Sequence, residues 1–82
     1  MKNRDEILQL IRDIMQEMFE IEANEVTLEA NLYKDLDFDS IDAVDMIVNL
    51  KETTGKALKP EDFKNARTVN DVVEAVYKLI DE

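Results

Sequence analysis

The apolar residues of this chain recur at every third or fourth position along most of its length, a spacing that predicts helices rather than strands. The 82 residues include one glycine and one proline, whereas β-hairpins depend on such residues for their turns. We therefore expect an all-α fold, a four-helix bundle of three longer helices and one short helix. A chain of this length predicts a single domain over residues 1–82.

The first predicted helix spans residues 4–20. Asn3 and Glu6 have the spacing of a capping box at its start. Its apolar face is formed by Ile7, Leu10, Ile11, Ile14, Met15, Met18 and Phe19. Residues 20–36 break the periodicity and predict a long loop that scattered apolar side chains hold against the core, with one turn of helix inside it.

Signals for three further helices follow this loop. The second helix is predicted to begin near Asp39 and Ser40, two good N-cap types, and to end at Gly55, where glycine adopts the left-handed conformation without steric cost. Pro60 is typical of a first helical turn and predicts the short third helix. The capping pair of Thr68 and Asp71 precedes a last helix of about twelve residues.

The chain contains no cysteine and no histidine. It therefore lacks a disulfide, a thiolate nucleophile, the usual general base and the commonest metal ligands. We expect no enzymatic activity and no metal site. Uninterrupted apolar runs reach only three residues, as at positions 46–48, which is too short for a membrane span or a signal peptide and favours a cytoplasmic location.

The formal charge of −10 is concentrated in one segment, because residues 20–45 hold nine acids and one lysine. This sign disfavours nucleic acids and anionic lipids as partners, and it favours proteins with basic surfaces. Asp39, Asp42 and Asp45 lie three apart near one face of the predicted second helix, among apolar residues. These acids are either favourable neighbours of the helix dipole or part of a docking surface for a basic partner.

Part of this acidic segment has the pattern of a calcium-binding loop. Asp35, Asp37 and Asp39 match the opening of an EF-hand, which needs glycine at its sixth position and a bidentate glutamate at its twelfth. Those two positions are Ser40 and Met46. The sequence therefore disfavours a specific calcium site.

Ser40 lies among carboxylates, and the chain offers no base to activate its hydroxyl, so it is not a catalytic nucleophile. It is either a plain helix cap or an exposed acceptor of a modification. The stretch Asp-Leu-Asp-Phe-Asp-Ser-Ile-Asp at positions 35–42 closely resembles the attachment motif of acyl carrier proteins, usually written D-L-G-x-D-S-L-D. The resemblance extends over essentially the whole chain, through the turn at Pro60 to the valine-rich last helix.

This resemblance implies that a phosphopantetheinyl transferase attaches 4'-phosphopantetheine from coenzyme A to Ser40. The arm would supply the thiol that the sequence lacks, and acyl groups would travel on it as thioesters. Family membership further implies a monomer that docks on acyl-loading, ketosynthase, reductase or acyltransferase enzymes with basic surfaces, in fatty-acid, polyketide or specialised lipid synthesis. The partner-binding residues that it implies are Asp39, Ile41, Asp42, Val44, Asp45 and Val48.

Two residues depart from the family pattern. Asp37 replaces the usual glycine, so the chain must either avoid a left-handed conformation there or adopt it at some cost. Lys51 stands where many members have an acid, which reverses the charge at the far end of the second helix.

The position of Phe38 is left open, since this residue either packs beneath the loop or stays exposed. Two other functions remain open, namely a peptidyl or aminoacyl carrier and an acidic interaction module without a prosthetic group.

Overall fold

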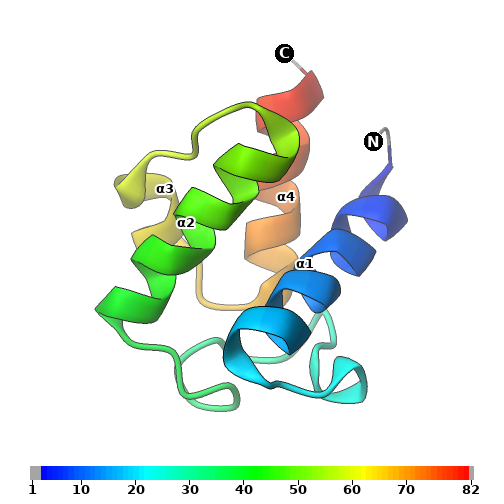
Figure 1. Cartoon of the computed structure of the whole chain (residues 1–82), viewed down its shortest axis with the longest axis vertical. Coiled ribbons are helices and arrows are strands. Elements are labelled where there is room, and N and C mark those ends of the chain that lie inside the picture. Colours follow the sequence, from blue (N-terminus) through cyan, green and yellow to red (C-terminus); the bar gives the residue numbers. More distant parts are fainter. Residues whose placement is uncertain (1–2, 82) are drawn as a thin grey trace.

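A computed structural model describes residues 3–81, apart from the side chains at positions 62, 64 and 81. Within this range the chain is helical and has no strand, so the predicted all-α class is confirmed (Figure 1). The elements are α1 (Arg4–Phe19), the 3-10 turn η1 (Ala23–Glu25), α2 (Ser40–Thr54), α3 (Pro60–Asn65) and α4 (Val69–Asp81). α1, α2 and α4 are the longer helices, and α3 has six residues.

Local signals at both ends of α1 set its limits. Asn3 Oδ1 accepts a hydrogen bond from the backbone amide of Glu6 at 2.9 Å, so the predicted N-cap is confirmed. Glu20 adopts a left-handed conformation with φ 57° and ends the helix one residue earlier than we expected. Met18, which was assigned to the apolar face, is 49% exposed. That assignment was wrong, because the buried face of α1 is narrower than the run of apolar residues.

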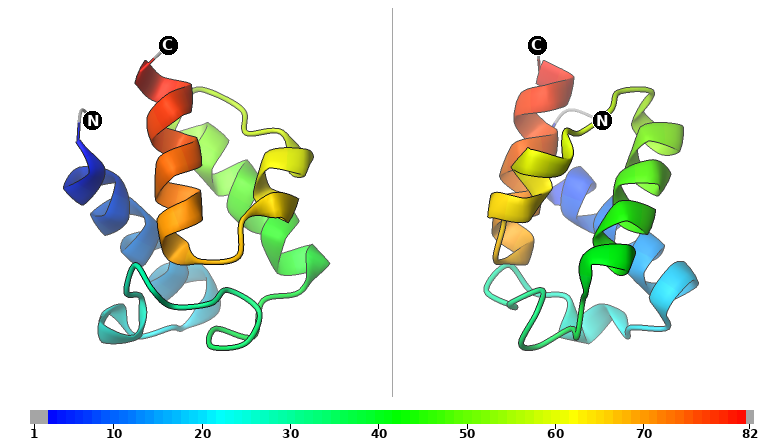
Figure 2. Two further views of the ribbon diagram at one scale, coloured as in Figure 1. Left: turned by 180° about the vertical axis from the view of Figure 1, so that it is seen from behind. Right: turned by 90° about the vertical axis from the view of Figure 1, so that its left-hand side faces the viewer.

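The long loop between α1 and α2 is held down by contacts at several points, and it contains the expected helical turn at η1. Arg12 of α1 donates from Nε to the backbone carbonyl of Val26 at 2.8 Å. Farther along, the amide of Leu32 donates to the carbonyl of Arg67 at 2.8 Å, and the amide of Val69 donates to the carbonyl of Ala30 at 3.0 Å. The loop therefore closes one end of the bundle beneath α4 (Figure 2).

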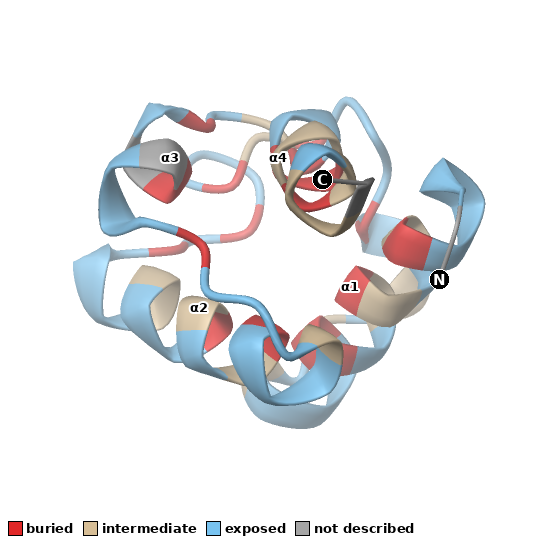
Figure 3. Cartoon of the chain, turned by 90° about the horizontal axis from the view of Figure 1, so that it is seen from above, coloured by how far each residue is buried: buried red, intermediate tan, exposed pale blue. Residues whose placement is uncertain are grey.

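The core lies between the inward faces of the helices, and all of its buried residues are apolar within the described part of the chain (Figure 3). α4 supplies Val69, Val72, Val73 and Val76, which lie at the helical spacing seen in the sequence. Phe63 gives the short α3 a single large anchor. None of the described helices has the length and apolar character needed to cross a bilayer.

Surface contacts join α1 to α4. The Arg4 guanidinium donates hydrogen bonds to the carboxylate of Glu74 and lies over the ring of Tyr77, 4.3 Å from its centroid. The hydrogen bond and charge of Arg4 lower the pKa of Glu74. Because these groups are at the surface, they add little to stability.

The capping pair predicted before α4 is present. The Thr68 hydroxyl accepts the Asp71 amide at 3.2 Å, while Asp71 Oδ2 accepts the amides of Arg67 at 2.9 Å and Thr68 at 3.1 Å. These backbone bonds to Arg67 and Thr68 lower the pKa of Asp71. The carboxylate is thus favoured in the folded state, and it joins α4 to the connection from α3.

The Asp71→Asn substitution should reduce the free energy of unfolding at neutral pH and do so progressively less in acid. A folded pKa below the ordinary value of 3.8 means that the stabilisation is complete above that value and is lost as the pH falls through the folded pKa. Urea unfolding of both proteins over a pH series measures the difference. A difference that is constant or grows towards low pH would contradict this role for the carboxylate.

Candidate functional site

Two aspartates fix the start of α2. Asp39 is the N-cap, with an extended backbone at φ −121°, and its Oδ1 accepts the amides of Ile41 and Asp42, each at 2.9 Å. In return, Asp42 Oδ2 accepts the amide of Asp39 at 3.3 Å. This reciprocal capping box satisfies amides that have no partner within the helix, and it defines which residue comes first in α2.

That first residue is Ser40, and its side chain is exposed. Within residues 3–81 the serine hydroxyl takes part in no hydrogen bond. The capping function belongs to Asp39 and not to Ser40, so helix stability does not occupy the hydroxyl. The site therefore presents a hydroxyl group at the N-terminus of the 15-residue helix α2, where it is accessible to solvent.

Three apolar side chains extend from α2 into solvent. Ile41 is 70% exposed, Val44 is 55% exposed and Val48 is 49% exposed. Asp45 is also exposed, and no described side chain forms a hydrogen bond or an ion pair with its carboxylate. The structure thus brings Ser40 and the six predicted partner-binding residues together on α2 and its N-cap, and none of the seven is buried.

In the segment before Ser40, buried side chains alternate with exposed ones. Leu36 and Phe38 are buried, Asp37 between them is exposed, and the Phe38 amide donates to the Leu32 carbonyl at 2.9 Å. The Phe38 ring packs on that of Phe19 with 4.9 Å between centroids. This settles the question left open for Phe38, which packs inside. The alternation of apolar and acidic residues at 36–39 is the sequence pattern from which burial of Phe38 follows.

Asp37 adopts the left-handed conformation, with φ 56°. The chain therefore keeps the geometry that the family motif assigns to glycine, and it does so with an aspartate. Among residues with a Cβ, aspartate tolerates this region better than most, since its short polar side chain limits the strain. This departure from the motif leaves the path into α2 intact.

Two of the three carboxylates that suggested a calcium loop accept hydrogen bonds from backbone amides. Asp35 Oδ2 accepts the amide of Asn31 at 2.8 Å, and Asp39 caps α2. Among the residues that the structure describes, no group of three or more potential ligands is arranged to hold a metal ion. The loop acids thus organise the backbone around the site.

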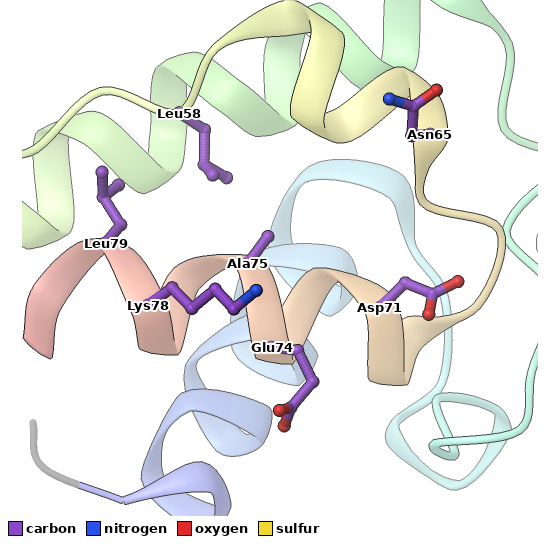
Figure 4. A pocket seen from close by; sticks show the side chains of 7 residues that line it. All are labelled: Leu58, Asn65, Asp71, Glu74, Ala75, Lys78 and Leu79. Carbon is purple, nitrogen blue, oxygen red and sulfur yellow. The ribbon is translucent and has the colours of Figure 1, made fainter.

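The surface has a hollow beside this region and another away from it. One of about 500 Å³ lies beside the N-terminus of α2 and is lined by five acidic and four apolar residues, including Phe19, Phe38 and Asp42. A second, of about 400 Å³, lies along α4, where Leu79 and Ala75 point towards Leu58 and polar side chains form the rim (Figure 4). None of the seven predicted site residues lines this second hollow.

Comparison with known proteins agrees with this geometry. Residues 9–76 match the family model described as "Phosphopantetheine attachment site". This match covers most of the chain, so the protein belongs to the class of carrier domains that bear this arm.

Its relatives define the class further. The chain is 55% identical over 75 residues to acyl carrier protein 2 of Ralstonia nicotianae, covering 92% of this chain and 93% of the relative. The Enterococcus faecalis acyl carrier protein structure is 32% identical and covers 96% of this chain and 99% of its own, with a TM-score of 0.77. That from Thermotoga maritima, 24% identical with coverages of 95% and 91%, shares the fold at a TM-score of 0.83.

The chain is therefore a member of the acyl carrier protein family, whose members are carriers and not enzymes. The cofactor of this family is a covalent 4'-phosphopantetheine arm. The residues present fit such a group, because the Ser40 hydroxyl is exposed and has no hydrogen-bond partner in the described chain. A tether at the head of a helix also leaves room for an enzyme to reach it.

Substitutions at Asp37 should separate backbone strain from charge. Asp37→Gly should change the free energy of unfolding by less than about 0.5 kcal/mol, since relief of the left-handed conformation offsets the added entropy of the unfolded chain. Asp37→Val removes the same charge but should cost about 1 to 3 kcal/mol, because a β-branched residue is strained at positive φ. Urea denaturation measures both values.

Lys34→Val is the matched control, since Lys34 is exposed in the same loop and is not among the residues with positive φ. It should be close to neutral. Equal effects of glycine and valine at position 37 would contradict the strain at this residue.

Proposed function

We propose that this protein carries acyl intermediates as thioesters on a 4'-phosphopantetheine arm attached to Ser40. The observation that carries the proposal is the exposed Ser40 hydroxyl, which makes no hydrogen bond to the described residues and lies at a helix start fixed by Asp39 and Asp42. The arm supplies a thiol at its end, which the chain lacks. Residues 1–82 act as one domain in this proposal, with the short α3 as the fourth helix of the bundle and the cytoplasm as its location.

The proposed partners are enzymes whose surfaces complement α2. A phosphopantetheinyl transferase delivers the arm, and acyl-loading, ketosynthase, reductase or acyltransferase enzymes use the loaded carrier. Exposed apolar side chains at Ile41, Val44 and Val48 provide area that a partner can bury. The acids around them attract cations and accelerate encounter. Asp45 contributes to this attraction, and Asp39 and Asp42 also hold the helix start.

The alternatives differ in what they load. A peptidyl or aminoacyl carrier would bear the same arm and accept an amino acid from an adenylating enzyme. An acidic interaction module would remain unmodified at Ser40. The similarity to acyl carrier proteins over nearly the whole chain favours the acyl carrier. Parallel loading with an acyl-loading enzyme and an amino-acid adenylating enzyme distinguishes the two carriers.

Incubation with coenzyme A and a promiscuous phosphopantetheinyl transferase should add the mass of one arm to the wild-type protein. Ser40→Ala should gain nothing, because the chain has no other serine. Intact-mass spectrometry measures both. Thr53→Ala, which removes an exposed hydroxyl from the other end of α2, should be modified like the wild type. Equal modification of wild type and Ser40→Ala, or of neither, would falsify the assignment.

The Asp45→Lys substitution should slow this modification about fivefold at low ionic strength, because it replaces an attractive charge on the docking face with a repulsive one. Asp45 makes no capping bond, so the change leaves the start of α2 intact. The difference from wild type should shrink as salt is added. Asp5→Lys in the first turn of α1 makes the same charge change elsewhere. Equal slowing of both variants, or a salt-independent rate, would rule out local electrostatic docking.

A further inference from the structure

The exposed face of α2 carries three parallel rows of side chains. Residues seven positions apart in a helix differ by only about 20° in direction, so they form rows along its axis. Ile41 and Val48 form the middle row. Asp45 and Glu52 form a second row on one side, and Val44 and Lys51 form a third on the other. All six residues are exposed, and the exposed stretches of α2 face away from the other helices (Figure 3).

The two outer rows therefore carry charges of opposite sign. One row is acidic at both of its positions, Asp45 and Glu52. The opposite row ends in the cation of Lys51, one turn beyond Val48. Glu52 follows Lys51 in sequence but projects about 100° away from it, so the two charges meet different parts of an opposing surface.

Lys51 has no internal role that removes it from this face. Within the described chain its ammonium forms no hydrogen bond and no ion pair. A cation in the last turn of α2 suits the carbonyl end of the helix dipole. That interaction leaves the ammonium in solvent, where it meets whatever surface covers Val44 and Val48.

We propose that Lys51 determines which enzymes can dock on this face. The matching partner surface has a shallow apolar groove for Ile41 and Val48, cations along the wall that faces Asp45 and Glu52, and a carboxylate on the opposite wall facing Lys51. An enzyme with cations on both walls is disfavoured, because one of them would face the ammonium. This inference rests on the proposed function and specifies the partners of the same site.

The test uses a malonyl-loading acyltransferase whose docking surface carries only lysine and arginine. Wild type, Lys51→Gln and Lys51→Glu are first converted completely to the form bearing the arm, as checked by intact mass. Malonyl loading should then be fastest for Lys51→Glu, intermediate for Lys51→Gln and slowest for wild type. We expect about a three- to fivefold range in kcat/KM at low salt, the size typical of exposed ion pairs.

Lys78→Glu is the matched control, since it makes the same charge change on α4, which lies across the bundle from α2 (Figure 2). Its kcat/KM should stay within twofold of wild type. Thermal unfolding of each variant reports whether loss of the C-terminal cation has weakened α2. The neutral Lys51→Gln variant keeps the test valid if Lys51→Glu is destabilised.

Each docking cation of the acyltransferase is then changed to glutamate in turn. At least one such enzyme should reverse the order and prefer wild type over Lys51→Glu, which would locate the carboxylate that the native partner needs. If no enzyme variant reverses the order, or if Lys51→Glu and Lys78→Glu behave alike, Lys51 has no such role. Absence of the arm from the wild-type protein would instead contradict the proposed function.

Discussion

The position of the site depends on the burial of Leu36 and Phe38 on either side of an exposed acid. Two apolar anchors separated by one residue force the residue between them outwards. Asp37, the exposed residue, adopts the left-handed conformation. Because both apolar side chains are buried, Asp39 lies at the surface, where it caps α2, and Ser40 follows it there. Packing in the core thus determines the placement of a hydroxyl that makes no hydrogen bond within the described part of the chain.

The acids of this segment divide into two groups by what they contact. Asp35, Asp39 and Asp42 accept hydrogen bonds from backbone amides and so shape the loop and the helix start. The Asp45 carboxylate accepts no such bond from the residues that the structure describes, and it remains available to an approaching surface. A high local charge therefore does not mean that every carboxylate serves recognition. Substitution of a capping acid changes structure and charge together, whereas substitution of Asp45 changes mainly the charge.

Much of this architecture followed from the sequence, because the signals were local. Asn3, Gly55 and Thr68 mark helix ends through their own side chains or backbone freedom, and the structure has the ends at or next to them. Met18 was misassigned because periodicity reports the direction of a side chain but not whether another element covers it. The Arg12 contact with Val26 and the contact between Phe19 and Phe38 join distant segments, so no local pattern could reveal them.

The interior of the described chain contains no buried polar or charged residue. Its cohesion therefore comes from dispersion and from the exclusion of water, neither of which depends strongly on direction. A hydrocarbon guest entering such an interior would exchange one set of methyl and methylene contacts for another of the same kind. No hydrogen bond between buried side chains would have to break for such a guest to enter.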